Sequence, residues 1–411
     1  MSTRTPVACL RDHVGSTVTI AGWVHRRRVL KSVSFLVIRD RSGTAQAVFA
    51  NPPDVTEETV VRLTGPVVAT SQGAELRDPT VEVLSTADKR PPFDLYRPEV
   101  SAGLPVVLDN AAVALRHPLL RRRFEVAAAS VAAFRRALDN QGFTEIHTPK
   151  IVATATESGS NVFQLDYFGR PAYLAQSPQF FKQAMVGVFE RVYEVGPVFR
   201  AEPHDTARHL AQYTSLDAEL GFITDHRDVM TVLRDVIAEM ATAAGPDAPF
   251  VPEEIPSIDF AAAQELLTQH TGEDPRGEPD LAPAHERWLC EWSEREHGSE
   301  FLFVTGYPMA KRPFYTHPDP TNPTKSNSFD LLFRGLELVT GGQRLHRYSD
   351  YLTALGDQAG QYSDYLAAFA HGMPPHGGFA IGLERWIARV LNVANVRGAT
   401  LFPRDLHRLR P

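Results

Sequence analysis

The sequence is poor in the residues and runs that mark disulfide-bonded, secreted or membrane proteins. Among 411 residues only Cys9 and Cys290 are cysteines, so neither a disulfide framework nor a cysteine-ligated zinc site is expected. No apolar run reaches about 18 residues, and no apolar signal core follows Met1. We therefore expect a cytoplasmic protein without membrane contact, whose 43% hydrophobic content suffices for two or three domains.

The familiar motifs for phosphate and zinc are also absent. No GxxxxGK[ST] occurs, and no GxGxxG lies between a strand pattern and a helix pattern. His204 and His209 have four residues between them and lack the glutamate of HExxH, and His371 and His376 repeat that spacing beside prolines. Any nucleotide must therefore be held in another way, and zinc is not expected.

Residues 1–88 have the pattern of a small β-barrel. Five short strand-like stretches are separated by turn signals, which favours a Greek-key barrel of the OB type. A hairpin at Arg41-Ser42-Gly43 would place Phe35, Val37, Gln46 and Val48 on one face. There Phe35 could stack on a base, Gln46 could pair with a base edge, and Arg28 could contact phosphate. The alternative is that Phe35 belongs to the core and the arginines are solvated surface.

The remaining chain changes character twice. Residues 89–118 are rich in proline and read as a hinge or linker. Residues 119–411 then mix strand patterns with helix patterns near 225–242 and 261–296, which indicates an α+β domain on an antiparallel sheet flanked by helices. Within this domain, residues from about 243 to 300 read as a helical insertion.

Charged residues gather at the ends of the apolar strands in this large domain. Unpaired ions cost several kcal/mol in an apolar interior, so such positions need a reason. An ion-pair network could explain two or three of them, but the whole set better fits a polyphosphate held by arginines with carboxylates on a divalent metal. The set comprises Arg200, Glu202, Arg208, His209, Asp217, Glu219, Glu337, Arg344, Glu384 and Arg385.

Three stretches in order carry a resemblance to a known family. "GFTEIHTPKI", "FRAEPHDTARHLAQYTSLDAELGFI" and "GGFAIGLERW" resemble the three motifs of class II aminoacyl-tRNA synthetases. With a barrel in front, the chain resembles subclass IIb and, within it, the short archaeal-like aspartyl-tRNA synthetases, over essentially its whole length. The resemblance implies a homodimer, with Pro149 at the interface, and an anticodon-binding barrel that uses Arg28, Phe35 and Gln46.

The resemblance also implies an ATP site. Arg200 would contact the α-phosphate, Glu202 the adenine amino group, and Tyr213 and Arg385 the two faces of the adenine. The outer phosphates and Mg²⁺ would be held by a second set, which consists of Arg208, His209, Glu337 and Thr340. Arg200, Glu337 and Arg385 would carry catalysis, and His204 and Asp205 at the loop tip would lie near the tRNA acceptor stem.

The implied amino acid is L-aspartate. Its α-amino group would be accepted by Glu157 and Asp217, and its side-chain carboxylate by Lys182 and Arg344. Ser177 and Gln179 complete the pattern of the same loop. Because two buried cations leave a neutral carboxamide poorly matched, this set favours aspartate over asparagine through the cost of an unsatisfied charge.

The implied reaction is ATP-dependent formation of aspartyl-adenylate and transfer of the aspartyl group to tRNA-Asp. His25 stands where relatives that also charge tRNA-Asn often have histidine, so tRNA-Asn is a second expected acceptor. Three alternatives stay open: an asparaginyl-tRNA synthetase, a paralogue with another acceptor, and a regulatory RNA-binding protein that has lost catalysis.

Overall fold

The computed structural model describes residues 4–71, 73–154 and 161–411. The chain divides into two compact units, Met1–Arg121 and Arg122–Arg410. Each unit has a hydrophobic core of its own. No helix in the described ranges is long and apolar enough to cross a membrane.

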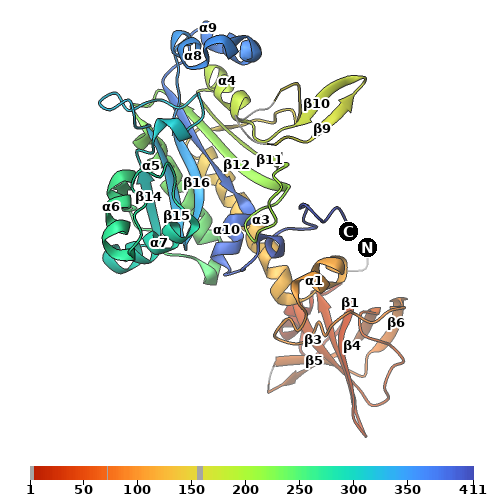
Figure 1. Ribbon diagram of the computed structural model, residues 1–411. Coiled ribbons are helices and arrows are strands. Elements are labelled where there is room, and N and C mark those ends of the chain that lie inside the picture. The colour runs from red at the N-terminus through yellow and green to blue at the C-terminus, as the bar shows by residue number, and fades with distance from the viewer. Residues whose placement is uncertain (1–3, 72, 155–160) are drawn as a thin grey trace. The chain divides into compact units, whose positions relative to one another are not determined.

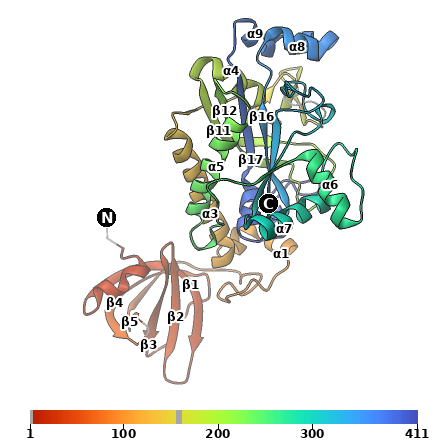
Figure 2. The ribbon, with the colours of Figure 1, turned by 90° about the vertical axis from the view of Figure 1, so that its left-hand side faces the viewer.

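The first unit contains the expected barrel. Five strands close in the order β1-β2-β3-β5-β4, because β4 also pairs with β1 (Figure 2). The strands are β1 (Thr17–Val29), β2 (Ser34–Asp40), β3 (Gly43–Phe49), β4 (Val60–Thr70) and β5 (Gly73–Arg77), with β6 (Thr80–Ser85) added beside β4 and the short helix η1 (Val7–His13) in front. A Cβ on Gly22 would lie 2.2 Å from the carbonyl oxygen of Arg39, so only glycine allows β1 and β2 to approach this closely.

The predicted hairpin register is also confirmed. Phe35 lies opposite Val48, and Val37 lies opposite Gln46, so these four residues share a face. The intervening Leu36 and Ile38 point into the barrel core and are completely buried. Phe35 is only partly buried and does not belong to the core cluster, which leaves one side of its ring for a contact.

The proline-rich stretch is more regular than its composition indicates. It contains two short helices, α1 (Leu104–Asp109) and α2 (Ala111–Ala114), and Pro105 stands in the first turn of α1, where its missing N–H costs no hydrogen bond. The long helix α3 (Pro118–Asp139) follows at once.

The second unit is built on an eight-stranded sheet in the order β13-β14-β15-β16-β17-β12-β11-β7 (Figure 1). Its strands are β7 (Thr144–Glu145), β11 (Arg191–Phe199), β12 (Gln212–Gly221), β13 (Ser257–Asp259), β14 (Phe301–Thr305), β15 (Ser328–Phe333), β16 (Leu336–Gln343) and β17 (His376–Gly382). The six central strands are antiparallel, as expected, and β7 and β13 at the two edges pair in parallel, so the sheet is mixed.

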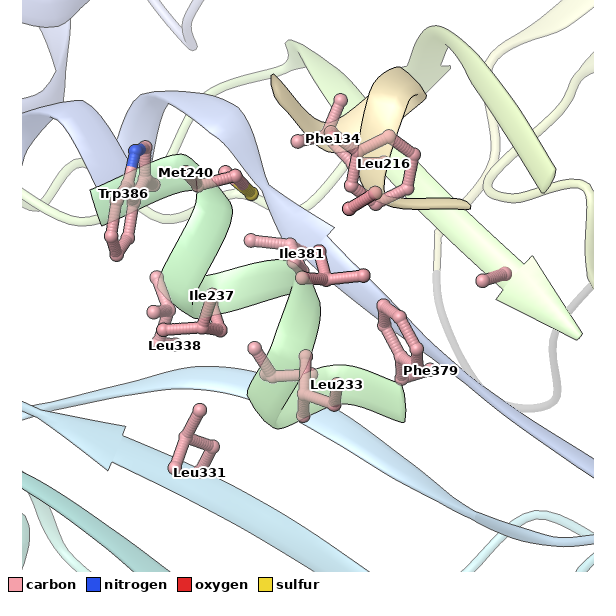
Figure 3. Packing of buried hydrophobic residues seen from close by; sticks show 14 of the residues in the cluster. Phe134, Leu216, Leu233, Ile237, Met240, Leu331, Leu338, Phe379, Ile381 and Trp386 are labelled. Atoms are coloured by element: carbon pink, nitrogen blue, oxygen red, sulfur yellow. The ribbon is translucent and has the colours of Figure 1, made fainter. Parts of the chain in front are cut away.

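Helices flank this sheet. Helix α5 (His226–Ala243) begins at Asp225, whose side chain caps it by accepting from the N–H of Arg227, and its buried stripe packs on β16 and β17. Figure 3 shows Leu233, Ile237 and Met240 of this stripe against Leu338 and Ile381 of the sheet. The other helices are α4 (Gln179–Phe189), α6 (Phe260–Thr271), α7 (Pro283–His297), α8 (Tyr348–Leu355), α9 (Ser363–Ala370) and α10 (Leu383–Val390).

Smaller elements complete the unit. A separate three-stranded sheet, in the order β8-β10-β9, is formed by β8 (Ile151–Val152), β9 (Gln164–Tyr167) and β10 (Arg170–Leu174). Four short 3-10 helices are described: η2 (Gly245–Asp247), η3 (Met309–Lys311), η4 (Gly356–Tyr362) and η5 (Val396–Ala399). Helices α4, α8 and α9 lie together at one end of the large sheet (Figures 1 and 2).

Candidate active site

A cavity of about 360 Å³ in the second unit is lined by most of the predicted site residues. Its walls come from the loop after β11, from β12 and β16, from the start of α10 and from α4. The predicted residues that line it are Gln179, Lys182, Arg200, Glu202, Arg208, His209, Tyr213, Glu337, Thr340, Arg344 and Arg385. Residues separated by up to 206 positions in the sequence, from Gln179 to Arg385, therefore face one volume.

Arg200 and Glu202 begin the loop between β11 and β12. The guanidinium of Arg200 lies 3.8 Å from the carboxylate of Glu202, and its Cζ lies 5.7 Å from the centre of the Tyr213 ring. His209, on the returning arm, lies 3.9 Å from Glu202. Burial, more than any neighbouring charge, lowers the pKa of His209 from its ordinary value.

The tip of this loop is tied to the C-terminal segment. Arg397 forms an ion pair with Asp205 and donates to Asp405 at 2.5 Å. The N–H of Val396 donates to the carbonyl of Ala207 at 3.0 Å. Since one arginine holds both the loop tip and the C-terminal segment, Asp205 already has a partner inside the protein, and any contact with an acceptor stem would compete with it.

Arg208 has a partner that the sequence did not indicate. Its Nη2 donates to Oε2 of Glu286 in α7 at 2.5 Å, and the N–H of Glu337 donates to the same oxygen at 2.9 Å. Burial raises the pKa of Glu286, and these two donors act against that rise. Glu286 gave no signal in the sequence because α7 is rich in charged residues and nothing distinguishes this one.

A second unexpected pair lies beside Glu337 and Thr340. Thr340 donates to Glu337 at 2.9 Å, and Asp330 on β15 lies directly opposite Thr340 in the sheet. Asp330 is 4% exposed, accepts from Arg312 at 3.2 Å, and its Oδ1 accepts no hydrogen bond. Burial raises the pKa of Asp330 to about 6. A buried carboxylate oxygen without a donor, near a second carboxylate and a hydroxyl, is a suitable set of ligands for Mg²⁺.

The described residues contain no group of three or more histidines, cysteines and carboxylates able to hold a metal ion by themselves. Mg²⁺ does not require such a group, because it keeps several waters and is usually bound by one or two carboxylates together with substrate phosphates.

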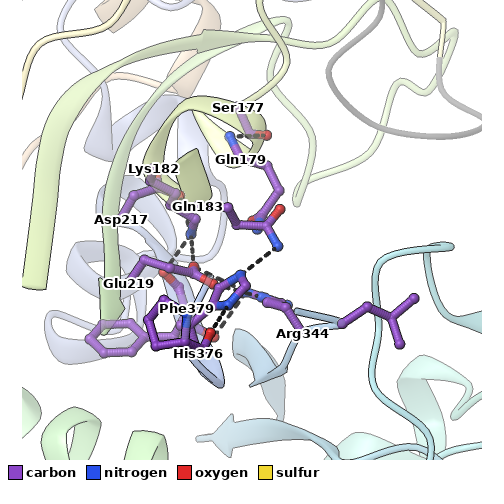
Figure 4. A network of polar contacts seen from close by, with 12 residues as sticks. Ser177, Gln179, Lys182, Gln183, Asp217, Glu219, Arg344, His376 and Phe379 are labelled. Atoms are coloured by element: carbon purple, nitrogen blue, oxygen red, sulfur yellow. Dashed lines mark hydrogen bonds and ion pairs between the residues drawn. The ribbon is translucent and has the colours of Figure 1, made fainter. Parts of the chain in front are cut away.

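Lys182 and Arg344 both line the cavity and both contact Glu219 (Figure 4). Lys182 is completely buried and contacts Asp217 at 2.9 Å and Glu219 at 3.4 Å. Arg344 donates to Glu219 at 3.0 Å and to the carbonyl of Gly378 at 3.0 Å. Burial alone would raise the pKa of Glu219, but Arg344 and Lys182 outweigh it and hold that pKa below its ordinary value.

The sequence-based reason for aspartate therefore needs a correction. We expected two cations whose charge only a substrate carboxylate would satisfy, but Asp217 and Glu219 already neutralise them. What distinguishes a carboxylate from a carboxamide here is hydrogen-bond polarity: Lys and Arg only donate, a carboxylate only accepts, and the NH₂ of a carboxamide would meet a donor.

The remaining predicted amino-acid contacts differ in where they lie. The side-chain nitrogen of Gln179 is buried, borders the cavity and makes no hydrogen bond, so it is a donor in need of an acceptor. Ser177 accepts from the N–H of Gln179 at 3.2 Å and is not among the lining residues. Asp217 is also behind the lining, with its oxygens occupied by Lys182 and Ser215. Glu157 lies outside the described residues.

Comparison with known proteins identifies the family. A model described as tRNA synthetases class II (D, K and N) matches residues 104–406. The chain belongs to this family. A second model, an OB-fold nucleic acid binding domain, matches residues 18–84.

Similar class II synthetases are known over the full length. The Aspartate–tRNA(Asp/Asn) ligase of Thermus thermophilus is 45% identical over 99% of this chain and 100% of the relative. The Aspartate–tRNA(Asp) ligase of Thermoplasma volcanium is 37% identical over 99% and 100%. Among solved structures, asparaginyl-tRNA synthetase from Pyrococcus horikoshii, complexed with asparaginyl-adenylate, matches with a TM-score of 0.92, 30% identity and full coverage of both chains.

The barrel of this class II synthetase presents the predicted anticodon residues on one face. Arg28 is exposed, and its Cζ lies 5.7 Å from the Phe35 ring centre. Gln46 donates to Glu75 at 3.0 Å, and Arg77 donates to the same carboxylate at 2.7 Å. Glu75 and Arg77 were not predicted, because only the parallel pairing of β3 with β5 brings them beside Gln46.

His25, the residue on which the expectation for tRNA-Asn partly rested, is not an exposed barrel residue. It is 8% exposed, and its Nδ1 lies 2.8 Å from Arg39, which in turn makes a two-pronged contact with Glu58 at 2.9 Å. Its influence on a bound anticodon would therefore be exerted through Arg39 and the barrel wall.

Proposed function

We propose that the chain is an aspartate–tRNA ligase, which forms aspartyl-adenylate from L-aspartate and ATP and transfers the aspartyl group to the 3′ end of tRNA. The observation that carries this proposal is the placement of Lys182 and Arg344 in the same cavity as Arg200 and Arg385. Two donor-only side chains suit a substrate carboxylate, and the two arginines suit a nucleotide. The names of the full-length relatives support the same activity.

ATP would occupy the outer part of the cavity. Arg200 would bind the α-phosphate and stabilise charge that develops there, since its planar fork matches two phosphate oxygens. Glu202 would accept from the adenine amino group, and Tyr213 and Arg385 would hold the ring between them. Arg208 and His209 would contact the outer phosphates, with Arg208 exchanging or sharing its contact to Glu286.

Mg²⁺ would be held by Glu337 and Thr340 together with Asp330, whose unpaired Oδ1 is the feature that favours a cation there. When bound, the ion would neutralise charge on the outer phosphates. Arg312, which donates to Oδ2 of Asp330, would keep this carboxylate ionised and oriented.

The chain's own contribution to the chemistry is positioning. Aspartate supplies the nucleophile, its α-carboxylate, which attacks the α-phosphate as pyrophosphate leaves, so no protein nucleophile is needed. Lys182, Arg344 and Gln179 would fix the aspartate side chain, and Glu157 and Asp217 are the predicted acceptors for the α-amino group. Because Asp217 lies behind Lys182, it would act on the substrate mainly through that cation.

The partner would be tRNA-Asp, with tRNA-Asn as a second acceptor, because the relatives include ligases named for both and for tRNA-Asp alone. The barrel face with Arg28, Phe35 and Gln46 would bind the anticodon, and the protein would work in the cytoplasm.

We also propose a homodimer. An apolar groove of about 540 Å³ runs along α3 and the C-terminal segment and is lined by Phe124, Val131, Leu401 and Phe402. Leu401 and Phe402 are both exposed, and Pro149, predicted at an interface, is exposed too. A second copy of the chain would cover such a surface.

Amino-acid-dependent exchange of pyrophosphate into ATP tests the proposed activity. The purified protein is assayed with aspartate, asparagine and no amino acid, at equal enzyme and Mg²⁺ concentrations. We expect exchange with aspartate and little with asparagine. Exchange with asparagine alone would instead support an asparaginyl-tRNA synthetase, the function that the similarity to the Pyrococcus horikoshii structure favours.

A further inference from the structure

A second group of buried polar side chains lies behind Lys182 and Arg344. It consists of Gln183 on α4, Tyr351 on α8, Tyr365 on α9 and His376 at the start of β17. Their exposed fractions are 0%, 0%, 7% and 0%, and none of them lines the cavity. Polar groups buried this deeply cost free energy unless they are paired, and aliphatic residues could fill the same space.

The four side chains form one hydrogen-bonded network. Tyr365 donates to Oε1 of Gln183 at 2.9 Å, and its hydroxyl lies 2.8 Å from that of Tyr351. Tyr351 contacts the carbonyl of Leu345 at 2.9 Å. The amide nitrogen of Gln183 lies 3.3 Å from Nε2 of His376.

The chemistry of His376 and its partners fixes the orientation of the Gln183 amide. A carbonyl only accepts, so Nδ1 of His376, 2.9 Å from the carbonyl of Pro374, carries a proton. Burial lowers the pKa of His376 to about 4, so near neutral pH Nε2 has none and accepts from Gln183. The amide of Gln183 therefore has one favoured orientation, with its NH₂ toward His376 and its oxygen toward Tyr365.

Lys182 and Arg344 are attached to this network through the backbone. Gln183 follows Lys182 on α4, and Leu345 follows Arg344. The N–H of Arg344 also donates to the carbonyl of His376 at 2.8 Å. The network therefore connects three segments: the one that carries Lys182, the one that carries Arg344, and β17, which pairs with β12 beside Glu219. Figure 4 shows Gln183 and His376 directly beside the ion pairs of Lys182, Arg344 and Glu219.

We propose that Gln183, Tyr351, Tyr365 and His376 are positioning residues, which hold Lys182 and Arg344 at the spacing that a side-chain carboxylate requires and so set the preference for aspartate over asparagine. This inference rests on the proposed function. Because the charge of the two cations is already neutralised, selection depends on where their N–H donors point, and donor geometry is sensitive to shifts below 1 Å.

Tyr365→Phe tests the proposal with the smallest change. The ring, which stacks on Phe180 with 4.4 Å between centres, is retained, while Oε1 of Gln183 loses its donor. In the exchange assay we expect the KM for aspartate to rise about tenfold and the ratio of kcat/KM for aspartate to that for asparagine to fall about tenfold, with the KM for ATP unchanged.

Tyr362→Phe is the matched control. Tyr362 also contacts the Phe180 ring, 5.8 Å between centres, but does not belong to the network, so its variant should keep the native ratio. Gln183→Met removes both the amide nitrogen and the amide oxygen, so it should also lower the ratio of kcat/KM for aspartate to that for asparagine. An unchanged ratio in folded Tyr365→Phe and Gln183→Met, even with lowered thermal stability, would overturn the proposal. A native protein that does not activate aspartate would instead overturn the proposed function itself.

Discussion

Close backbone approach at one glycine fixes the position of Glu219, the carboxylate shared by Lys182 and Arg344. A Cβ on Gly378 would lie 2.0 Å from Oε2 of Glu219 and 2.1 Å from the carbonyl of Ala218. The backbone cannot move away easily because β17 is paired on both sides. Glycine at this position therefore allows Glu219 to pair with Lys182 and Arg344.

We predict that Gly378→Ala destabilises the protein by about 1–3 kcal/mol through overpacking. It should also raise the KM for aspartate, since Glu219 must shift and Arg344 with it. Denaturant unfolding and the exchange assay measure the two effects. Gly360→Ala, where an added Cβ meets nothing within 4 Å, is the control. Equal behaviour of the two variants would contradict this account.

His25 makes a different prediction, because it is buried beside Arg39. Burial first, and Arg39 second, lower its pKa to about 4. In the unfolded chain His25 binds a proton near pH 6.5, whereas in the folded protein it stays neutral until about pH 4. The free energy of unfolding therefore decreases as the pH falls from about 6.5 toward 4. We predict that His25→Gln reduces this acid-induced loss of unfolding free energy by on the order of 1 kcal/mol. At pH 8 the substitution should change the free energy of unfolding by less than that.

Unfolding of the native protein and His25→Gln at pH 8 and pH 5 provides the measurement. His376 contributes acid sensitivity of the same sign in both proteins, so the difference between them isolates His25. Parallel loss of stability in the two proteins would show that the His25 side chain is not the source.

At the scale of elements, Arg397 holds the loop between β11 and β12. It bridges Asp205 in the loop and Asp405 in the C-terminal segment. We predict that Arg397→Gln leaves the KM for aspartate near its native value but raises the KM for ATP by about tenfold, because Arg208 and His209 are ordered less well. Steady-state exchange kinetics measure both constants.

The control for this variant is Arg276→Gln. Arg276 also bridges two carboxylates, Asp274 and Glu265, but on an exposed turn outside the cavity lining. If both variants left the KM for ATP unchanged, the bridge made by Arg397 would have no part in nucleotide binding.

The elements also show how far the sequence could predict the site. Charged residues at the ends of apolar strands, such as Arg200 and Arg385, stood out because an ion there needs a reason. Asp330 lies inside the apolar strand β15 and was not predicted, because only the pairing of β15 with β16 places it opposite Thr340. This pairing contains a register shift between Leu331 and Leu332, and the local alternation of residues does not reveal such a bulge.

Other parts could not be predicted for a similar reason. Lys182 and Arg344 form ion pairs with Asp217 and Glu219, and the paired residues lie up to 125 positions apart in the sequence. The sequence therefore showed these charged residues but not which of them pair. Residues 89–118 were predicted to be a hinge because they are rich in proline. A proline in the first turn is nevertheless compatible with a helix, and α1 begins in this way. The barrel and the large sheet were predictable because their strand and turn patterns are local.

For the whole molecule, the two units have separate cores and separate proposed tasks. Amino-acid activation would need only the cavity, while charging of tRNA would also need the barrel face. We predict that Phe35→Ala lowers kcat/KM for tRNA by about 10–100-fold through lost stacking and leaves aspartate-dependent exchange unchanged.

Leu84→Ala is the control for Phe35→Ala. Leu84 is also apolar and exposed on the barrel, on β6 rather than on the predicted anticodon face. Similar losses in both variants would indicate general damage to the barrel, and equal losses in charging and exchange would contradict the division of tasks.

The most direct test of the central claim is charging of purified tRNA transcripts with labelled aspartate. The native protein, ATP and Mg²⁺ are incubated with tRNA-Asp and, in parallel, with tRNA-Asn and an unrelated tRNA. We predict that labelled aspartate is esterified to tRNA-Asp, to tRNA-Asn as a second acceptor, and not to the unrelated tRNA. Formation of aspartyl-adenylate without esterification of tRNA-Asp or tRNA-Asn would contradict the account.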